Sequence, residues 1–149
     1  MDKFKILIVD DETDFLETIV VRLKKRKLDA TGVTSGEAAI EQLKNQIFDV
    51  ILLDVKMPGG MDGIETLREI KKIQPLAEVV MLTGHASLET SIEGMKQGAF
   101  DYLLKPMKLE NLLKKMTEAF ENKSRHDKKN RNAVIKDLKQ NSDSTIKKT

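Results

Sequence analysis

Short apolar runs start at intervals of 21 to 29 residues along this chain, and this spacing constrains its fold more than any other feature. Four of the runs are nearly continuous, which is typical of strands buried on both faces of a parallel sheet. A fifth is interrupted by polar residues and suits an edge strand. The predicted strands span residues 4–9, 28–33, 50–53, 79–82 and 100–104. Each gap between them has room for one helix and two short loops.

The gaps carry apolar residues at helical spacing, so a helix is predicted after every strand. The predicted inward faces are, in chain order, Phe15, Leu16, Ile19, Val20 and Leu23; Ala39, Ile40, Leu43 and Ile47; Ile64, Leu67 and Ile70; Leu88, Ile92 and Met95; and Leu109, Leu112, Leu113, Met116 and Phe120. The fourth helix is the weakest, because it contains Gly94, which costs about 1 kcal/mol relative to alanine. Five such units predict an α/β fold, a (βα)5 doubly wound parallel sheet with helices on both faces.

Charge divides the chain into two parts. Residues 1–121 carry 17 basic and 21 acidic side chains, whereas residues 122–149 carry nine basic and three acidic ones. The second part is polar and cannot build a core of its own. We therefore expect one domain over residues 1–121 and a basic, solvated, partly disordered tail over residues 122–149, with no output domain. Within the tail, Val134, Ile135 and Leu138 suit one or two short amphipathic turns.

Composition excludes several classes of protein. The chain has no cysteine, which rules out a disulfide scaffold, a thiolate metal site and a cysteine nucleophile. No apolar run approaches the roughly 20 residues of a membrane span. The first apolar run meets Asp10, Asp11 and Glu12 too soon for a signal peptide. We expect a cytoplasmic protein with no membrane contact.

Polar residues stand where the predicted strands end. The first strand is followed by Asp10 and Asp11, the third by Asp54, the fourth by Thr83 and the fifth by Lys105. Each has an ordinary alternative, because a carboxylate can cap a helix or a turn and a lysine can simply be solvated. Ligands of open parallel sheets, however, bind outside the carboxyl ends of the strands. Because all these residues fall at that edge, we predict one shared site.

The charges of this predicted site indicate its ligand. Three carboxylates held close together repel one another, so at least one pKa should rise unless a cation balances them. Oxygen ligands, with no histidine or cysteine, favour Mg²⁺ or Mn²⁺, and Mg²⁺ suits phosphate chemistry. A carboxylate can attack phosphorus to form an acyl phosphate, and a lysine and a threonine can hold the phosphoryl oxygens.

The segments that carry these residues resemble the receiver domain of bacterial two-component response regulators. The resemblance covers about residues 3–121 and rests on ILIVDD at 6–11, LLDVKMP at 52–58, MLTG at 81–84 and GAFDYLLKP at 98–106. It implies a flavodoxin-like strand order, 2-1-3-4-5. It also implies a phosphoprotein of a phosphorelay that receives its phosphoryl group from a sensor histidine kinase or a phosphotransfer protein.

The resemblance assigns roles in the predicted site. Asp54 would be the phosphoacceptor. Mg²⁺ would be held by Asp10, Asp11 and Asp54, together with the backbone carbonyl of Lys56. Lys105 would contact the phosphoryl group, and its bond to the following proline is expected to be cis.

The resemblance also implies a switch. Thr83 would move toward the phosphoryl group and Tyr102 would turn inward with it, changing a surface around the fourth helix and fifth strand. That surface would bind a downstream protein or a second copy of the chain. The ordinary alternative for Tyr102 is a half-buried packing residue at a strand end.

Two features near Asp54 are particular to this chain. The loop after it contains Gly59 and Gly60, one residue more than the usual family form, which adds a flexible position. Lys56 lies two residues after Asp54, and His85 lies two residues after Thr83. We hypothesise that these two side chains tune the lifetime of the acyl phosphate by screening water; otherwise they are solvated rim residues.

Other functions fit the sequence less well. A phosphatase of the haloacid dehalogenase type needs a second aspartate where this chain has Lys56, so we predict a self-catalysed phosphoacceptor rather than a turnover enzyme. Flavin binding is disfavoured because acidic residues 10–12 would repel its phosphate, and there is no Walker loop. The basic tail could bind nucleic acid weakly, but a mostly polar segment of 28 residues cannot fold into a helix-turn-helix domain. The sequence therefore predicts a stand-alone receiver.

Overall fold

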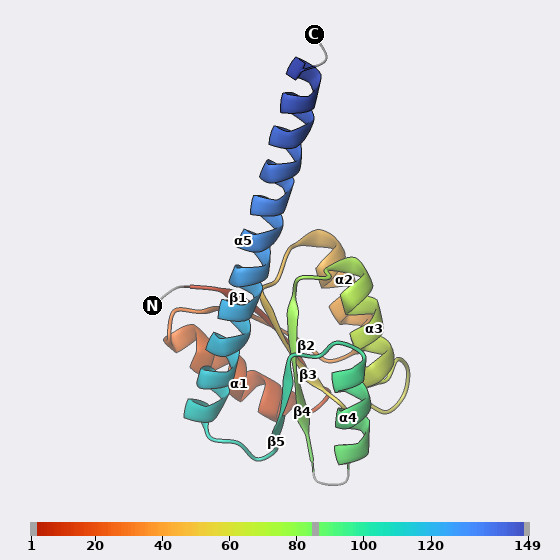
Figure 1. Cartoon of the computed structure of the whole chain (residues 1–149). Coiled ribbons are helices and arrows are strands. Elements are labelled where there is room, and N and C mark those ends of the chain that lie inside the picture. The colour runs from red at the N-terminus through yellow and green to blue at the C-terminus, as the bar shows by residue number, and fades with distance from the viewer. Residues whose placement is uncertain (1–2, 85–86, 148–149) are drawn as a thin grey trace.

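The computed structural model describes residues 3–84 and 87–147, with side chains described as far as Lys139. Within this part of the chain, strands and helices alternate from end to end (Figure 1). The strands are β1 (Lys5–Val9), β2 (Asp29–Val33), β3 (Val50–Asp54), β4 (Glu78–Thr83) and β5 (Asp101–Leu104). The helices are α1 (Thr13–Lys25), α2 (Gly36–Asn45), α3 (Gly63–Ile73), α4 (Leu88–Lys96) and α5 (Leu109–Lys147).

The strands form one parallel sheet in the order β2-β1-β3-β4-β5, which confirms the predicted fold class and strand order. Its register places the strand ends level with one another. Val9 pairs with Leu53, and Asp54 pairs with Leu82 in the next strand. The residues that follow these strands therefore meet at one edge of the sheet.

Two apolar cores cover the two faces of the sheet. Alternate strand residues such as Ile8 and Leu52 pack with α1 and α5, and their neighbours such as Leu7 and Leu53 pack with α2 and α3. This division explains why the central strands are apolar throughout, because both of their faces are buried. The core residues of β1 and β3 have almost no exposed surface.

The apolar stripe of α4 lies outward, which corrects the predicted inward face. Leu88, Ile92 and Met95 are 37%, 53% and 38% exposed, whereas Ser91 and Gly94 are buried. A Cβ atom at Gly94 would lie 2.2 Å from the sulfur of Met81. The helix therefore approaches the sheet through its smallest residues, and its larger apolar side chains stay on the surface.

Ile47 is a second correction. It is 73% exposed, because α2 ends at Asn45 and the chain turns toward β3 before Ile47 can continue the helical face. Helical spacing alone does not show where a helix ends.

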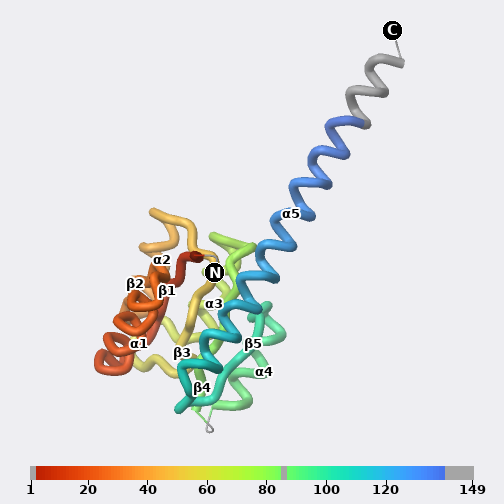
Figure 2. The backbone as a smooth tube through the Cα atoms, turned by 90° about the vertical axis from the view of Figure 1, so that its left-hand side faces the viewer, coloured from red at the N-terminus to blue at the C-terminus, as the bar shows by residue number. Residues whose placement is uncertain are grey.

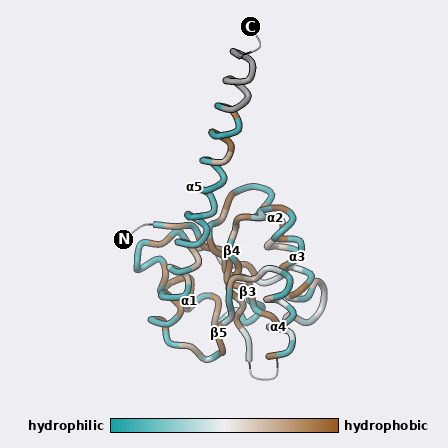
Figure 3. The backbone as a smooth tube through the Cα atoms, in the orientation of Figure 1, coloured by the Kyte–Doolittle hydropathy of each residue, from teal (hydrophilic) through white to brown (hydrophobic). Residues whose placement is uncertain are grey.

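Residues 122–147 continue α5 as one helix, whereas the sequence suggested a partly disordered tail. The helix projects well beyond the sheet (Figures 1 and 2) and its projecting part is largely hydrophilic (Figure 3). Two contacts hold its root: the amide of Asn122 donates to the carboxylate of Glu78, and Lys123 Nζ lies 3.2 Å from Asp49 Oδ1. The chain has no glycine or proline after Pro106, so nothing interrupts the helix. None of the described helices is both long enough and apolar enough to cross a membrane.

Candidate functional site

Three of the predicted site residues come together at the carboxyl edge of the sheet. Asp10 follows β1, Asp54 ends β3 and Lys105 follows β5. The Nζ atom of Lys105 lies 2.7 Å from Oδ2 of Asp10 and 3.8 Å from Oδ2 of Asp54. Residues that are far apart in the sequence thus form one charged cluster, as the strand-end pattern predicted.

Backbone amides orient the two buried carboxylates. Asp10 has no exposed surface, and its Oδ1 accepts a hydrogen bond from the Glu12 N–H at 2.9 Å. Asp54 is 5% exposed, and its Oδ1 accepts one from the Lys56 N–H at 3.2 Å. Each remaining Oδ2 atom faces Lys105.

The cluster perturbs the acidity of Asp54. Burial raises the pKa of the Asp54 carboxyl from 3.8 to about 7, and the negative charge of Asp10 adds to the effect. The charge of Lys105 and the hydrogen bond from the Lys56 N–H act in the opposite direction. A raised pKa in this cluster was expected from repulsion between carboxylates, but burial is its main cause and the charge of Asp10 comes second.

Lys105 is held on several sides. Burial acts to lower the pKa of its ammonium, but the hydrogen bond to Asp10 and the charges of Asp54 and Glu12 outweigh burial and raise that pKa. The ammonium lies 4.4 Å from the centre of the Phe15 ring and 3.5 Å from Glu12 Oε1. Its peptide bond to Pro106 is cis, as expected. The lysine is therefore a charged group fixed beside Asp54.

The carboxylates that could share a metal ion are Asp10, Glu12 and Asp54, each with an oxygen within 4.8 Å of the others. Asp11, which the resemblance placed in the metal site, is exposed in a bend and lies outside this group. Glu12 had not been considered as a ligand, although its place two residues after Asp10 was a signal for it. The set offers only carboxylate oxygens around a buried, charge-crowded acid, and such a set fits Mg²⁺.

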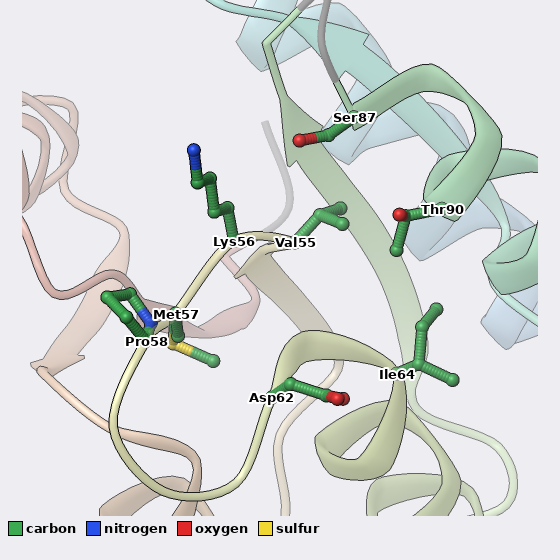
Figure 4. Close-up of a pocket in the computed structure, with 8 residues that line it drawn as sticks. All are labelled: Val55, Lys56, Met57, Pro58, Asp62, Ile64, Ser87 and Thr90. Atoms are coloured by element: carbon green, nitrogen blue, oxygen red, sulfur yellow. The ribbon is translucent and has the colours of Figure 1, made fainter.

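The remaining predicted residues surround this cluster. Thr83 ends β4, is 1% exposed, and donates its hydroxyl hydrogen bond to the Gly84 carbonyl at 3.1 Å. Tyr102 in β5 is half-buried against the core on the α2 and α3 side. Lys56 is exposed and lines a pocket with Ser87 and other residues between the β3–α3 loop and α4 (Figure 4). His85 lies outside the described residues.

Comparison with curated proteins places these features in context. A family model described as the response regulator receiver domain matches residues 6–117. The transcriptional regulatory protein ZraR of Escherichia coli (strain K12) is 40% identical over 111 residues, which are 74% of this chain and 25% of ZraR. The response regulator protein PilR of Pseudomonas aeruginosa is 38% identical over 112 residues, which are 75% of this chain and 25% of PilR. The chain thus spans about a quarter of the length of these relatives.

Solved structures agree with the family match. The receiver domain of NtrX from Brucella abortus has a TM-score of 0.75 at 30% identity, covering 78% of this chain and 98% of that one. A CheY-like receiver domain protein from Methanospirillum hungatei JF-1 has a TM-score of 0.78 at 30% identity, covering 84% and 99%. The five-stranded parallel sheet and its helices thus match the fold of solved receiver domains. The chain belongs to the response regulator receiver domain family of two-component systems.

Proposed function

We propose that Asp54 accepts a phosphoryl group from a histidine kinase or phosphotransfer protein, and that this changes a protein-binding surface around α4 and β5. The observation that carries the proposal is the geometry of the cluster. The buried Asp54 carboxylate at the end of β3 lies 3.8 Å from the Lys105 ammonium. One of its oxygens also lies within 4.8 Å of a carboxylate oxygen of Asp10 and one of Glu12. Charge neutralisation and positioning are most of what phosphoryl transfer requires.

The chemistry assigns one task to each group. An Asp54 oxygen attacks phosphorus to form an acyl phosphate, and the bond from phosphorus to the donor breaks. With phosphohistidine, the leaving imidazole nitrogen keeps that electron pair and takes up a proton. Lys105 holds a phosphoryl oxygen. Mg²⁺, held by Asp10, Asp54 and either Asp11 or Glu12 with the Lys56 carbonyl, would supply positive charge for the phosphoryl oxygens.

The proposed change in the protein-binding surface depends on Thr83 and α4. Among the described residues, the Thr83 hydroxyl donates a hydrogen bond to the neighbouring Gly84 carbonyl alone, so it can turn toward a phosphoryl oxygen at little cost. Helix α4 is nine residues long, and the side chain of its N-cap residue, Ser87, makes no capping hydrogen bond, which suits an element that shifts. Its outward residues Leu88, Ile92 and Met95 offer apolar surface to a downstream protein or a second copy. We propose that Thr83 and Tyr102 couple phosphorylation to this surface.

Intact-mass measurement tests the proposal. The wild-type chain is incubated with acetyl phosphate, with and without Mg²⁺, beside Asp54→Asn and Asp14→Asn variants. Asp14 is exposed on the first turn of α1 and serves as the matched control. We expect one Mg²⁺-dependent phosphoryl adduct in wild type and Asp14→Asn, absent in Asp54→Asn. A wild-type chain that stays unmodified, or an adduct that survives in Asp54→Asn, contradicts the proposal.

Two rival functions have their own measurements. Multiple turnovers of p-nitrophenyl phosphate would indicate a phosphatase rather than a phosphoacceptor. The exposed basic residues Arg125, Lys128, Lys129, Lys136 and Lys139 of α5 are the feature that favours nucleic-acid contact. We expect any such binding to be non-specific and to weaken steeply with salt. Sequence-specific binding that survives about 200 mM salt would overturn that expectation.

A further inference from the structure

The loop between β3 and α3 supplies backbone groups that lie beside the Asp54 carboxylate. It begins directly after the phosphoacceptor, and its Lys56 N–H orients the Asp54 carboxylate. The Lys56 carbonyl in the same loop is the predicted backbone ligand for Mg²⁺. Any change in the path of this loop therefore alters both the proposed nucleophile and the proposed metal site.

Both ends of the loop are fixed by packing. The Val55 N–H donates to the Leu82 carbonyl at 3.0 Å. Gly63 lies so close to Val55 that a Cβ atom there would be 2.5 Å from its carbonyl oxygen. Asp62 caps α3 by accepting a hydrogen bond from the Glu65 N–H at 2.8 Å. The ends therefore cannot adjust without disturbing the sheet or the helix.

The tip of the loop is far less constrained. Gly59 and Gly60 both have positive φ angles, 78° and 126°, which glycine adopts at little cost. A Cβ atom built at Gly59 would meet nothing within 4 Å. The loop follows a wide arc between Pro58 and Asp62 (Figure 4). The additional glycine thus adds freedom at the point where the loop has least support.

Glu37 is the side chain that reaches this tip. Its Oε1 accepts a hydrogen bond from the Met61 N–H at 2.6 Å and lies 3.0 Å from the position of a Cβ atom at Gly60. Glu37 stands in the first turn of α2, where a negative charge is favourable. Beside it, Gly36 packs closely on α3 and the loop: a Cβ atom there would lie 2.1 Å from Thr66 Oγ1 and 3.3 Å from Met61 Cβ. The start of α2 is therefore a rigid support for the loop tip.

We propose that Glu37 is a positioning residue that holds the β3–α3 loop and so places the Lys56 peptide group for metal binding. The expected effect on Mg²⁺ binding rests on the proposed function. The hydrogen bond between Glu37 and the Met61 N–H does not, because it is present in the chain without metal. The hydrogen bond joins a carboxylate to a backbone N–H, a charge-assisted pair that is stronger than a neutral one. Losing it frees the glycine pair to sample other backbone conformations.

Three variants separate this contact from general charge effects. Glu37→Ala removes the acceptor, and Glu37→Gln removes the charge but keeps an oxygen that can accept. Glu41→Ala removes a carboxylate one turn along the same helix, where it is exposed and forms an ion pair with Lys44 at 3.4 Å. Gly60→Ala is a second route to the same effect, because a methyl group there crowds Glu37 and strains the backbone.

Hydrogen–deuterium exchange in metal-free protein tests the contact, and Mg²⁺ titration calorimetry tests its consequence. We expect Glu37→Ala and Gly60→Ala to speed exchange over residues 57–62. They should also weaken Mg²⁺ affinity by roughly three- to tenfold, the change in a binding constant that corresponds to the net free energy of one hydrogen bond. Glu37→Gln should fall between wild type and Glu37→Ala, because its oxygen still accepts the hydrogen bond but without the added strength of a charge. Glu41→Ala should match wild type. Thermal unfolding serves as a check that the domain remains intact.

The two hypotheses fail in different ways. If wild type binds no Mg²⁺ and takes no phosphoryl group, the proposed function fails, while the exchange data still decide the role of Glu37. If wild type binds Mg²⁺ and Glu37→Ala matches it in exchange and affinity, only the present inference fails. If Glu37→Gln is as impaired as Glu37→Ala, the effect comes from charge, and the positioning role is wrong.

Discussion

Lys105 and Asp10 form an ion pair with an Nζ–Oδ2 distance of 2.7 Å although they are 95 residues apart in the sequence. Asp10 has no exposed surface, and the Lys105 side chain keeps 18% of its own. The pair joins the end of β1 to the end of β5 across the edge of the sheet. It also fixes the ammonium beside Asp54, so one contact serves both stability and the proposed chemistry.

Removing the Lys105 ammonium should destabilise the metal-free protein. Lys105→Met leaves Asp10 buried without its partner, and we expect a loss of about 3 kcal/mol, at the low end for breaking a buried ion pair because Lys105 keeps some contact with water. Urea unfolding at neutral pH measures the change. Lys44→Met is the control, since its exposed pair with Glu41 is worth less than about 1 kcal/mol. Equal stability of Lys105→Met and wild type would show that Asp10 does not need this partner.

Asp54 should make the metal-free protein less stable as the pH rises. Its pKa is about 7 in the folded chain against 3.8 for the free side chain, mainly because of burial. The folded state therefore keeps a proton that the unfolded state releases. This contribution to stability is complete below about pH 4 and is lost as the pH rises to about 7. Mg²⁺ affinity should increase over the same range, because the ligand must be deprotonated.

Asp54→Asn supplies the comparison for this pH dependence. The amide does not titrate, so the variant should gain stability relative to wild type between pH 4 and pH 7 and keep a constant difference above that. Urea unfolding of both proteins in chelator at several pH values measures the difference. If the two curves stay parallel from pH 4 to pH 8, Asp54 has no raised pKa.

The sequence predicted the meeting of strand-end residues at one edge of the sheet better than the packing around them, for a physical reason. Asp54 and Thr83 end apolar strands and Lys105 follows one, and parallel strands bring their carboxyl ends to the same edge of the sheet. The exposed stripe of α4 was not predictable in this way, because it depends on the close approach of Gly94 to Met81. Such a contact joins residues from different elements and leaves no periodic signal.

The carboxylate group and the end of α5 show the same limit. The bend after β1 turns Glu12 toward Asp54 and leaves Asp11 exposed, and that choice depends on backbone angles rather than on residue type. The continuation of α5 did have a signal, the absence of glycine and proline after Pro106. Polar composition obscured it, because the contacts of Asn122 and Lys123 that secure the helix involve distant residues.

Gly63 should tolerate no side chain. A Cβ atom there would lie 2.5 Å from the Val55 carbonyl oxygen and 2.8 Å from its Cα, and backbone atoms cannot move aside cheaply. We expect Gly63→Ala to destabilise the domain by about 1–3 kcal/mol, the cost of overpacking, although alanine favours helices. Thermal unfolding measures it. At Gly84 a Cβ atom would meet nothing within 4 Å, so Gly84→Ala should be neutral or slightly stabilising. Equal effects of the two changes would contradict this packing.

A proline substitution in the projecting part of α5 should unwind that part of the helix without destabilising the domain. Every residue from 131 to 139 is exposed, so the core does not depend on this segment. Ala133→Pro removes a helical hydrogen bond and clashes with the preceding turn, at a cost of about 3 kcal/mol. We expect far-UV circular dichroism to lose helical signal while the melting temperature of the domain stays unchanged. Ala119→Pro is the matched control, because Ala119 is fully buried in the core and proline there should unfold the domain. An unchanged spectrum for Ala133→Pro would mean that the segment is not helical in solution.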